Sequence, residues 1–214
     1  MPFFGPGLAY QEQGAGRPLI LLHGFAGNGA LWRPEAFPGH RVIRPDFRGH
    51  GLSEKPLDAA AYPPDVLADD GLALVEHLGL DDYDLGGYSL GGRIVARMLV
   101  RGATPRRAIV GGQGLREVQG IGGGAGAAFR NRAQGRPDAL VNVLDSLVAT
   151  PVDALTAVTT PTLVVIGRDD ERAVSGQQLA DALPHGRYAE IAGDHGSAAR
   201  SPELIGAMRD FLDA

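Results

Sequence analysis

A serine, a histidine and a pair of aspartates lie far apart in this sequence but could together perform nucleophilic catalysis. Ser89 is the centre of Gly87-Tyr88-Ser89-Leu90-Gly91, which matches the pattern G-x-S-x-G. Where a strand turns directly into a helix, the central residue is strained and the residues two positions away must be small. The serine hydroxyl then projects above the sheet at a helix N-terminus, where developing negative charge is stabilised. The pattern therefore predicts a nucleophile at Ser89.

The segments on either side of Ser89 support this prediction. Residues 83–85 predict a short strand, and residues 90–100 predict a helix with apolar side chains on one face. The alternative is an ordinary strand-to-helix turn with an inert serine, because a chain with 32 glycines can produce the pattern by chance.

A serine hydroxyl is a weak nucleophile near neutral pH and needs a base. The chain has six histidines, which are His23, His40, His50, His77, His185 and His195. His195 lies in a short loop between the last predicted strand and the final predicted helix, so we expect it to be the base. His77 lies inside a predicted helix, while His40 and His185 lie in turns beside glycine or proline, and we expect all three to be solvated.

An acidic residue would orient the imidazole and stabilise its protonated form. Asp169 and Asp170 follow the strand predicted at residues 162–166, at the same edge of the sheet as the other two groups. The residues alone leave the choice between these neighbouring carboxylates open.

The positions of these groups depend on a regular alternation of short apolar runs and amphipathic helices. This alternation predicts a mostly parallel sheet covered by helices, an α/β architecture. The predicted strands are residues 19–22, 42–43, 83–85, 108–110, 162–166 and 188–191, with an antiparallel edge strand at residues 7–13. The predicted helices are residues 67–78, 90–100, 138–148, 173–183 and 202–212.

Residues 111–160 interrupt this alternation. Residues 120–126 are mostly glycine and offer little side-chain surface for a core, so they predict a mobile loop. Together with the helix at residues 138–148, this segment is either a reduced lid over an active site or an ordinary connector.

The length and composition exclude several classes of protein. The 214 residues fit a single domain, 1–214, and a net charge of -5 gives no indication of nucleic-acid binding. The absence of cysteine excludes disulfides, thiolate zinc sites and cysteine nucleophiles. We find neither a secretory signal nor a run of apolar residues long enough to span a membrane, so we expect a cytoplasmic location.

These motifs together resemble the α/β-hydrolase superfamily over most of the chain. The order Ser89, Asp170, His195 is the order of nucleophile, acid and base in that fold. Residues 46–53 (DFRGHGLS) resemble its D-x-R-G-x-G-x-S loop, and Ser201-Pro202-Glu203 resembles the start of its last helix. The resemblance implies an α/β-hydrolase fold with helices on both faces of the sheet and residues 111–160 as a small lid insertion.

The resemblance also assigns roles to individual residues. Leu22-His23-Gly24-Phe25 is similar to the family's H-G-x segment, which implies an oxyanion hole made by the backbone N–H groups of Phe25 and Leu90. It implies Asp170 rather than Asp169 as the acid, and structural rather than proton-transferring roles for His23 and His50. No metal ion or organic cofactor is implied.

The chain departs from the family pattern at two places. The space between residues 110 and 160 is too short for the multi-helix cap of many relatives. In addition, Asp194 stands between Gly193 and His195, where many relatives have glycine next to histidine. Asp194 could perturb His195 electrostatically, but we expect it to be solvated.

The implied function is hydrolysis of a small-molecule ester, thioester or related acyl bond through a Ser-His-Asp triad. Alternatives on the same fold are a C–C bond hydrolase, a lyase, a cofactor-free haloperoxidase-like side activity and a non-catalytic ligand-binding protein. The lyase alternative rests on residues 87–93, which resemble the menaquinone-pathway succinyl-cyclohexadiene carboxylate synthases. A haloalkane dehalogenase is disfavoured, because its nucleophile is an aspartate.

Overall fold

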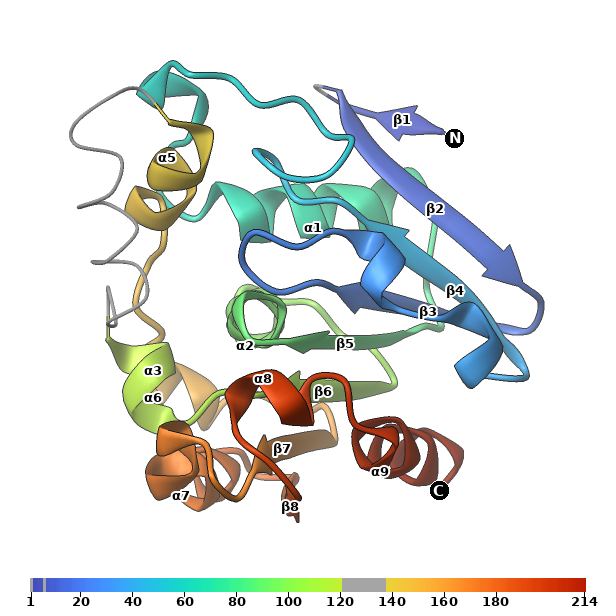
Figure 1. The fold of residues 1–214 in the computed structure, drawn as a ribbon, viewed down its shortest axis with the longest axis vertical. Helices are drawn as coiled ribbons and strands as arrows, with labels where there is room; N and C mark the ends of the chain where they lie inside the picture. Colours follow the sequence, from blue (N-terminus) through green and yellow to red (C-terminus); the bar gives the residue numbers. More distant parts are fainter. Residues whose placement is uncertain (1, 6, 121–137) are drawn as a thin grey trace.

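The computed structural model describes residues 2–5, 7–120 and 138–214. They form an 8-stranded sheet in the order β1-β2-β4-β3-β5-β6-β7-β8. The six strands β4-β3-β5-β6-β7-β8 pair with one another in parallel, whereas β2 is antiparallel to both β1 and β4. Figure 1 shows helices packed along this sheet, with α3 and α5 at the end of the molecule to which β3 and β5 point.

The described helices and strands have the following bounds. The strands are β1 Phe3–Phe4, β2 Leu8–Gly14, β3 Arg17–Leu22, β4 His40–Pro45, β5 Asp84–Tyr88, β6 Arg107–Gly111, β7 Thr162–Gly167 and β8 Gly186–Ile191. The α-helices are α1 Val66–His77, α2 Leu90–Val100, α3 Leu115–Gln119, α5 Ala139–Asp145, α6 Val152–Leu155, α7 Gly176–Asp181, α8 His195–Ala198 and α9 Pro202–Asp213. Short 3-10 segments lie at Gly29–Leu31, Pro34–Ala36, Ala59–Ala61 and Glu171–Ser175.

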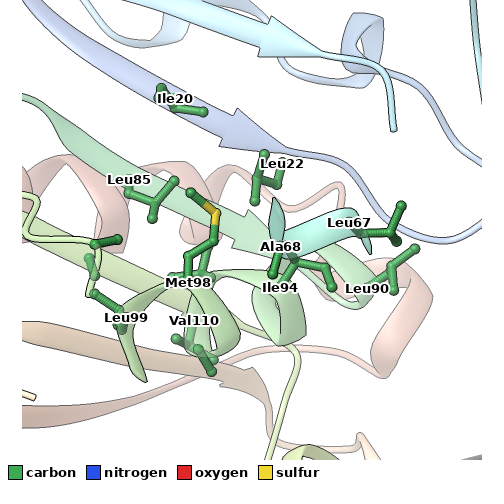
Figure 2. Packing of buried hydrophobic residues seen from close by; sticks show 14 of the residues in the cluster. Ile20, Leu22, Leu67, Ala68, Leu85, Leu90, Ile94, Met98, Leu99 and Val110 are labelled. Carbon is green, nitrogen blue, oxygen red and sulfur yellow. The ribbon is translucent and has the colours of Figure 1, made fainter. Parts of the chain in front are cut away.

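The central strands bury both faces, because alternate side chains point into two separate cores. In β3, Ile20 and Leu22 belong to one core, and Leu19 and Leu21 belong to the other. Figure 2 shows the first core, where Ile20 and Leu22 of β3 lie near Met98 of α2. The continuous apolar runs of the sequence are therefore strands covered on both sides.

Different helices cover the two faces. The first core contains buried side chains from α1, α2 and α7, and the second contains buried side chains from α8 and α9. Trp32 and Phe37, from the segment between β3 and β4, complete the second core. This three-layer arrangement leaves the loops after the strands as the places where polar side chains can gather.

The lack of a side chain at Gly91 lets α2 lie close to the sheet. A Cβ atom at Gly91 would lie 2.1 Å from the carbonyl oxygen of Leu22, and one at Gly87 would lie 2.4 Å from the carbonyl carbon of Gly91. Both contacts involve backbone, which cannot move aside as a flexible side chain could. The two outer glycines of the pentapeptide are thus required by the packing of α2 against β3 and β5.

Two arginines of α2 connect the helix to distant segments. Arg97 forms a bidentate ion pair with Asp65 and donates to the carbonyl oxygen of Ala149 at 3.0 Å. Arg93 is 7% exposed and donates to the carbonyl oxygens of Glu117, Gly120 and Val148. Arg93 therefore links residues that precede and follow the segment 121–137.

The predicted parallel strands and the helices at residues 67–78, 90–100 and 202–212 are confirmed, with boundaries shifted by a few residues at most. The antiparallel strand predicted at residues 7–13 is also found, as β2. It is not the edge strand that we expected, because β1 pairs with its outer side. The helix predicted at residues 173–183 is found but is shorter than expected, because a 3-10 turn at Glu171–Ser175 precedes α7. The helix predicted at residues 138–148 is shorter than expected, and residues 121–126 of the predicted loop lie outside the described residues.

The prediction that His40 is solvated is wrong. His40 is 8% exposed, and its Nε2 atom lies 3.6 Å from Asp84, whose side chain is fully buried. The two residues meet because β3 lies between β4 and β5, and these parallel strands begin at the same edge of the sheet. His40 therefore lies at the opposite end of the strands from Ser89.

Over the part of the chain that the structure describes, no helix combines the length and the apolar character needed to cross a membrane.

Replacing Gly91 by alanine should destabilise the fold. The new Cβ atom would clash with the Leu22 carbonyl, so we expect a loss of about 1–3 kcal/mol in the free energy of unfolding. Gly206→Ala in α9 is the matched control, because a Cβ atom there meets nothing within 4 Å. The control should gain about 0.5–1 kcal/mol from helix propensity. Urea denaturation measures both changes, and equal effects of the two variants would contradict this account of α2 packing.

Candidate active site

Ser89 occupies a strained turn between β5 and α2. Its backbone angles are φ 57° and ψ −118°, a conformation that residues with a side chain rarely adopt. The Ser89 N–H donates to the carbonyl oxygen of Gly111 at 2.9 Å. The Ser89 carbonyl accepts from the N–H of Arg93 at 3.0 Å and from the side-chain amide of Gln113 at 2.9 Å. Hydrogen bonds on both sides of the residue hold the strained conformation.

The structure brings Ser89, His195 and Asp170 into one chain of hydrogen bonds. The Oγ atom of Ser89 lies 2.8 Å from Nε2 of His195. The other ring nitrogen, Nδ1, lies 2.6 Å from Oδ2 of Asp170. A carboxylate cannot donate, so Nδ1 carries the proton and Nε2 is left to accept from the serine hydroxyl. This is the geometry of a nucleophile with a general base.

The environment of Asp170 keeps the carboxylate ionised. Burial raises the pKa of Asp170, but hydrogen bonds from His195 and from the backbone and side chain of Arg172 outweigh it, so the pKa lies below its usual value. Arg172 reaches Oδ1 through its backbone N–H at 3.1 Å and its guanidinium at 3.0 Å. The neighbouring Asp169 is exposed, and its backbone N–H donates to the carbonyl oxygen of Gly193 at 3.1 Å. Of the two aspartates, the structure thus places Asp170 at the imidazole.

Tyr88 holds His195 from the side of the nucleophile. Its hydroxyl donates to the backbone carbonyl oxygen of His195 at 3.0 Å, and the two ring centroids are 5.3 Å apart. Tyr88 directly precedes Ser89, so the nucleophile and the base are tied to each other through this side chain as well as through their own hydrogen bond.

Asp194 has a structural role that the sequence did not reveal. It is exposed, as expected, but its carboxylate accepts from the N–H groups of Gly196 and Ser197 and caps the short helix α8. These bonds to the residues after it lower the pKa of Asp194. The extra residue before His195 therefore fixes the start of the helix that carries the imidazole.

The segment His23-Gly24-Phe25 lies against Ser89. A Cβ atom at Gly24 would be 3.5 Å from the Cβ atom of Ser89. His23 accepts from the Phe47 N–H at Nε2 (3.0 Å), so Nδ1 carries the proton and donates to the Gly24 carbonyl at 2.8 Å. In a trans peptide the N–H points opposite to the C=O. His23 therefore fixes the orientation of the peptide plane that contains the Phe25 N–H.

His23 and His50 are both buried and neutral at neutral pH. Burial lowers the pKa of His23, and burial together with the nearby His23 lowers that of His50 to about 4. The His50 ring packs edge-on against Phe25 at 5.8 Å. The imidazoles of these two histidines hydrogen-bond to backbone groups of Gly24, Phe47 and Arg48 rather than to Ser89.

The loop at residues 46–53 is tied together by its own side chains. Asp46 accepts from the N–H groups of Gly29 and Leu52, each at 2.7 Å. Ser53 donates from Oγ to the Asp46 carbonyl at 2.6 Å, and Arg48 forms a bidentate pair with Asp70. These bonds position the loop rather than the reacting groups.

A cavity of about 200 Å³ opens above Ser89. It is lined by side chains that are mostly apolar, together with the serine and the imidazole: His23, Gly24, Phe25, Leu31, Trp32, Tyr88, Ser89, His195, Gly196, Ala199 and Arg200. Among the described residues, no group of histidine, aspartate or glutamate side chains is arranged to bind a metal ion.

Sequence reasoning missed three residues that support the site. Gln113 binds the Ser89 carbonyl, Tyr88 binds the His195 carbonyl, and Arg172 binds Asp170. Tyr88 and Arg172 lie within two positions of predicted site residues, which is a usable signal. Gln113 has no such signal, because its contact depends on how the loop after β6 returns toward α2.

Comparison with known proteins agrees with the observed fold. Residues 17–111 match the family model described as the alpha/beta hydrolase fold. The 2-hydroxymuconate semialdehyde hydrolase of Pseudomonas sp. (strain CF600) is 40% identical over 97 residues, which cover 42% of this chain and 34% of that protein. The chain thus matches only about a third of the length of such curated relatives.

Solved structures match nearly the whole chain. The enol-lactonase from Burkholderia xenovorans LB400 superposes with a TM-score of 0.77 at 22% identity, covering 97% of this chain and 96% of that one. An N-acyl homoserine lactone degrading enzyme superposes with a TM-score of 0.73 at 28% identity, covering 95% and 96%. With the parallel sheet and the serine turn between β5 and α2, these similarities show that the chain has the α/β-hydrolase fold.

Proposed function

We propose that this protein is a serine hydrolase that cleaves a carboxylic ester, thioester or related acyl bond through an acyl-enzyme. The observation that carries the proposal is the chain of hydrogen bonds from Ser89 through His195 to Asp170, with distances of 2.8 Å and 2.6 Å. A buried, ionised carboxylate behind the imidazole and a cavity in front of the serine complete the requirements for acyl transfer.

In the first half of the reaction, Ser89 Oγ attacks the acyl carbon and His195 Nε2 accepts the hydroxyl proton. The negative charge that develops on the carbonyl oxygen is stabilised by the backbone N–H groups of Leu90 and Phe25. Leu90 begins α2, where helix N–H groups lack intrahelical acceptors, and Phe25 lies in the turn against Ser89. A donor of this kind contributes about 3–4 kcal/mol to the transition state. The intermediate collapses as the imidazolium gives its proton to the leaving oxygen or sulfur.

In the second half, a water molecule replaces the leaving group. His195 removes a proton from the water, the resulting oxygen attacks the acyl carbon, and Ser89 Oγ leaves with the proton that the imidazole returns. Asp170 stabilises the imidazolium in both halves through Nδ1 and remains ionised. The bonds and protons balance without a further reactant.

Hydrolysis of a C–C bond is the second candidate, favoured by the 40% identical relative whose name describes a semialdehyde hydrolase. The same serine and imidazole would serve that chemistry. The assignment of residues 111–160 as a reduced lid stays a prediction; none of its described residues lines the cavity above Ser89.

A fluorophosphonate probe should label the protein at Ser89 and abolish turnover of 4-nitrophenyl acetate. Ser89→Ala should remove both the label and the activity, and circular dichroism should confirm that the variant is folded. Peptide mass spectrometry locates the label. A folded wild-type protein that stays unmodified would overturn the nucleophile and support a ligand-binding role. Turnover of C–C bonded diketones without any ester hydrolysis would promote the second candidate.

Exchanging each aspartate for asparagine should separate the acid from its neighbour. Asp170→Asn removes the charge behind His195 and should lower kcat by roughly 10³- to 10⁴-fold. Asp169→Asn is the matched control, and because its side chain is exposed, kcat should stay within about twofold. Steady-state kinetics on one ester measures both, and a greater loss at Asp169 would reverse the assignment.

A further inference from the structure

A positively charged residue, Arg200, lines the cavity above Ser89. Arg200 lies in the turn between α8 and α9, and its side chain lines the cavity of about 200 Å³ that also contains Ser89 and His195. It also lines an adjoining cavity of about 540 Å³, which shares Leu31, Trp32 and Ala199 with the first. A molecule held at Ser89 can therefore extend past Arg200 without leaving the surface of the protein.

Arg200 also lines a cavity that contains four acids, and two of these are bound by other groups. Asp170 is held by His195 and Arg172, and Asp194 accepts the N–H groups at the start of α8. Asp169 and Glu171 line the same cavity, but among the residues that the structure describes no carboxylate lies within 4.0 Å of a nitrogen atom of the exposed Arg200 guanidinium. Its guanidinium therefore keeps its donors for a ligand.

The other arginines around the site differ from Arg200 in this respect. Arg172 is bound to Asp170, and Arg93 is buried and bound to carbonyl oxygens. Arg33 is exposed and lines the cavity of about 540 Å³ but not the one that contains Ser89. Arg200 is the arginine that lines the cavity of the nucleophile.

Apolar surface connects the serine to this cation. Phe25, Trp32 and Ala199 line the cavity above Ser89. Leu31, which borders both cavities, is 65% exposed, so its side chain adds apolar surface that a ligand can reach. The arrangement fits a ligand with an apolar part between its reacting carbonyl and a negatively charged group.

We propose that Arg200 binds a carboxylate of the substrate. The substrates are then esters or lactones that carry a free carboxylate in addition to the acyl bond that is cleaved. This inference rests on the proposed function and narrows its substrate class. A planar guanidinium pairs with a carboxylate through two parallel hydrogen bonds, which neutral esters cannot form. The same chemistry serves whether the carboxylate lies on the acyl chain or on the leaving alcohol.

Two pairs of esters test this proposal. The pair for the acyl side is mono-4-nitrophenyl glutarate and 4-nitrophenyl valerate, which have equal acyl chain length and differ in charge. The pair for the alcohol side is acetoxyacetate and its methyl ester. We expect kcat/KM to favour the charged member of one pair by about tenfold or more, as for hydrogen bonds to charged groups. Because the contact is exposed, the preference should shrink with rising ionic strength.

Substitutions of Arg200 test whether this residue causes the preference for charged esters. Arg200→Gln should reduce the charged-to-neutral ratio of kcat/KM to about one, and Arg200→Lys should restore part of it. Arg209→Gln is the matched control, because it removes one exposed positive charge from α9 and lines neither cavity. It should leave the ratio unchanged.

The outcomes separate this inference from the proposed function. Equal turnover of charged and neutral esters in both pairs overturns the role of Arg200 but leaves the serine hydrolase intact. A charge preference that survives in Arg200→Gln also overturns it. No turnover of any ester, with Ser89 unlabelled by the fluorophosphonate, overturns both proposals.

Discussion

The positive φ angle of Ser89 is the constraint on which the rest of the site depends. Holding a residue with a side chain in this region costs about 1–3 kcal/mol, so the surroundings must compensate. Here they do so through Gly87 and Gly91, which admit the close approach of backbones, and through hydrogen bonds to both peptide groups of the serine. Because the backbone is fixed, Oγ has one direction in which to meet a base.

Parallel strands explain why that base and its acid arrive at the same place. The strands β3, β5, β7 and β8 run in one direction, so the loops that follow them share one edge of the sheet. Phe25, Ser89, Asp170 and His195 each follow a different one of these strands. Short connections are sufficient to bring them into contact, since the neighbouring strands already set their spacing.

Arginine serves three different purposes in this structure. Arg97 pairs with Asp65 and Arg48 pairs with Asp70, which fixes α1 against its neighbours. Among the described residues, the hydrogen-bond partners of Arg93 are all carbonyl oxygens, and burial lowers its pKa, so its contribution is to hold the chain on both sides of residues 121–137. Arg200 has no carboxylate partner among the described residues and faces the cavity, which is the basis for assigning it to a ligand.

The sequence by itself determined the architecture and three of the residues at the site, because periodicity and small-residue spacing are local. A strand covered on both faces must be apolar throughout, and a sharp strand-to-helix turn must have glycine two residues before and after its centre. These requirements predicted which residues form the buried strands and where Ser89 lies. The loop between the last predicted strand and the final predicted helix pointed to His195, and the resemblance to the family favoured Asp170 over Asp169.

Only the tertiary structure decided which groups touch. The choice of Asp170 over Asp169 depends on which carboxylate the turn after β7 directs inward, and a shift of one residue reverses that direction. The burial of His40 beside Asp84 and the contact of Gln113 with Ser89 join residues 44 and 24 positions apart. Such contacts depend on which strands pair and on the paths of the loops between them. Local sequence patterns do not encode either feature.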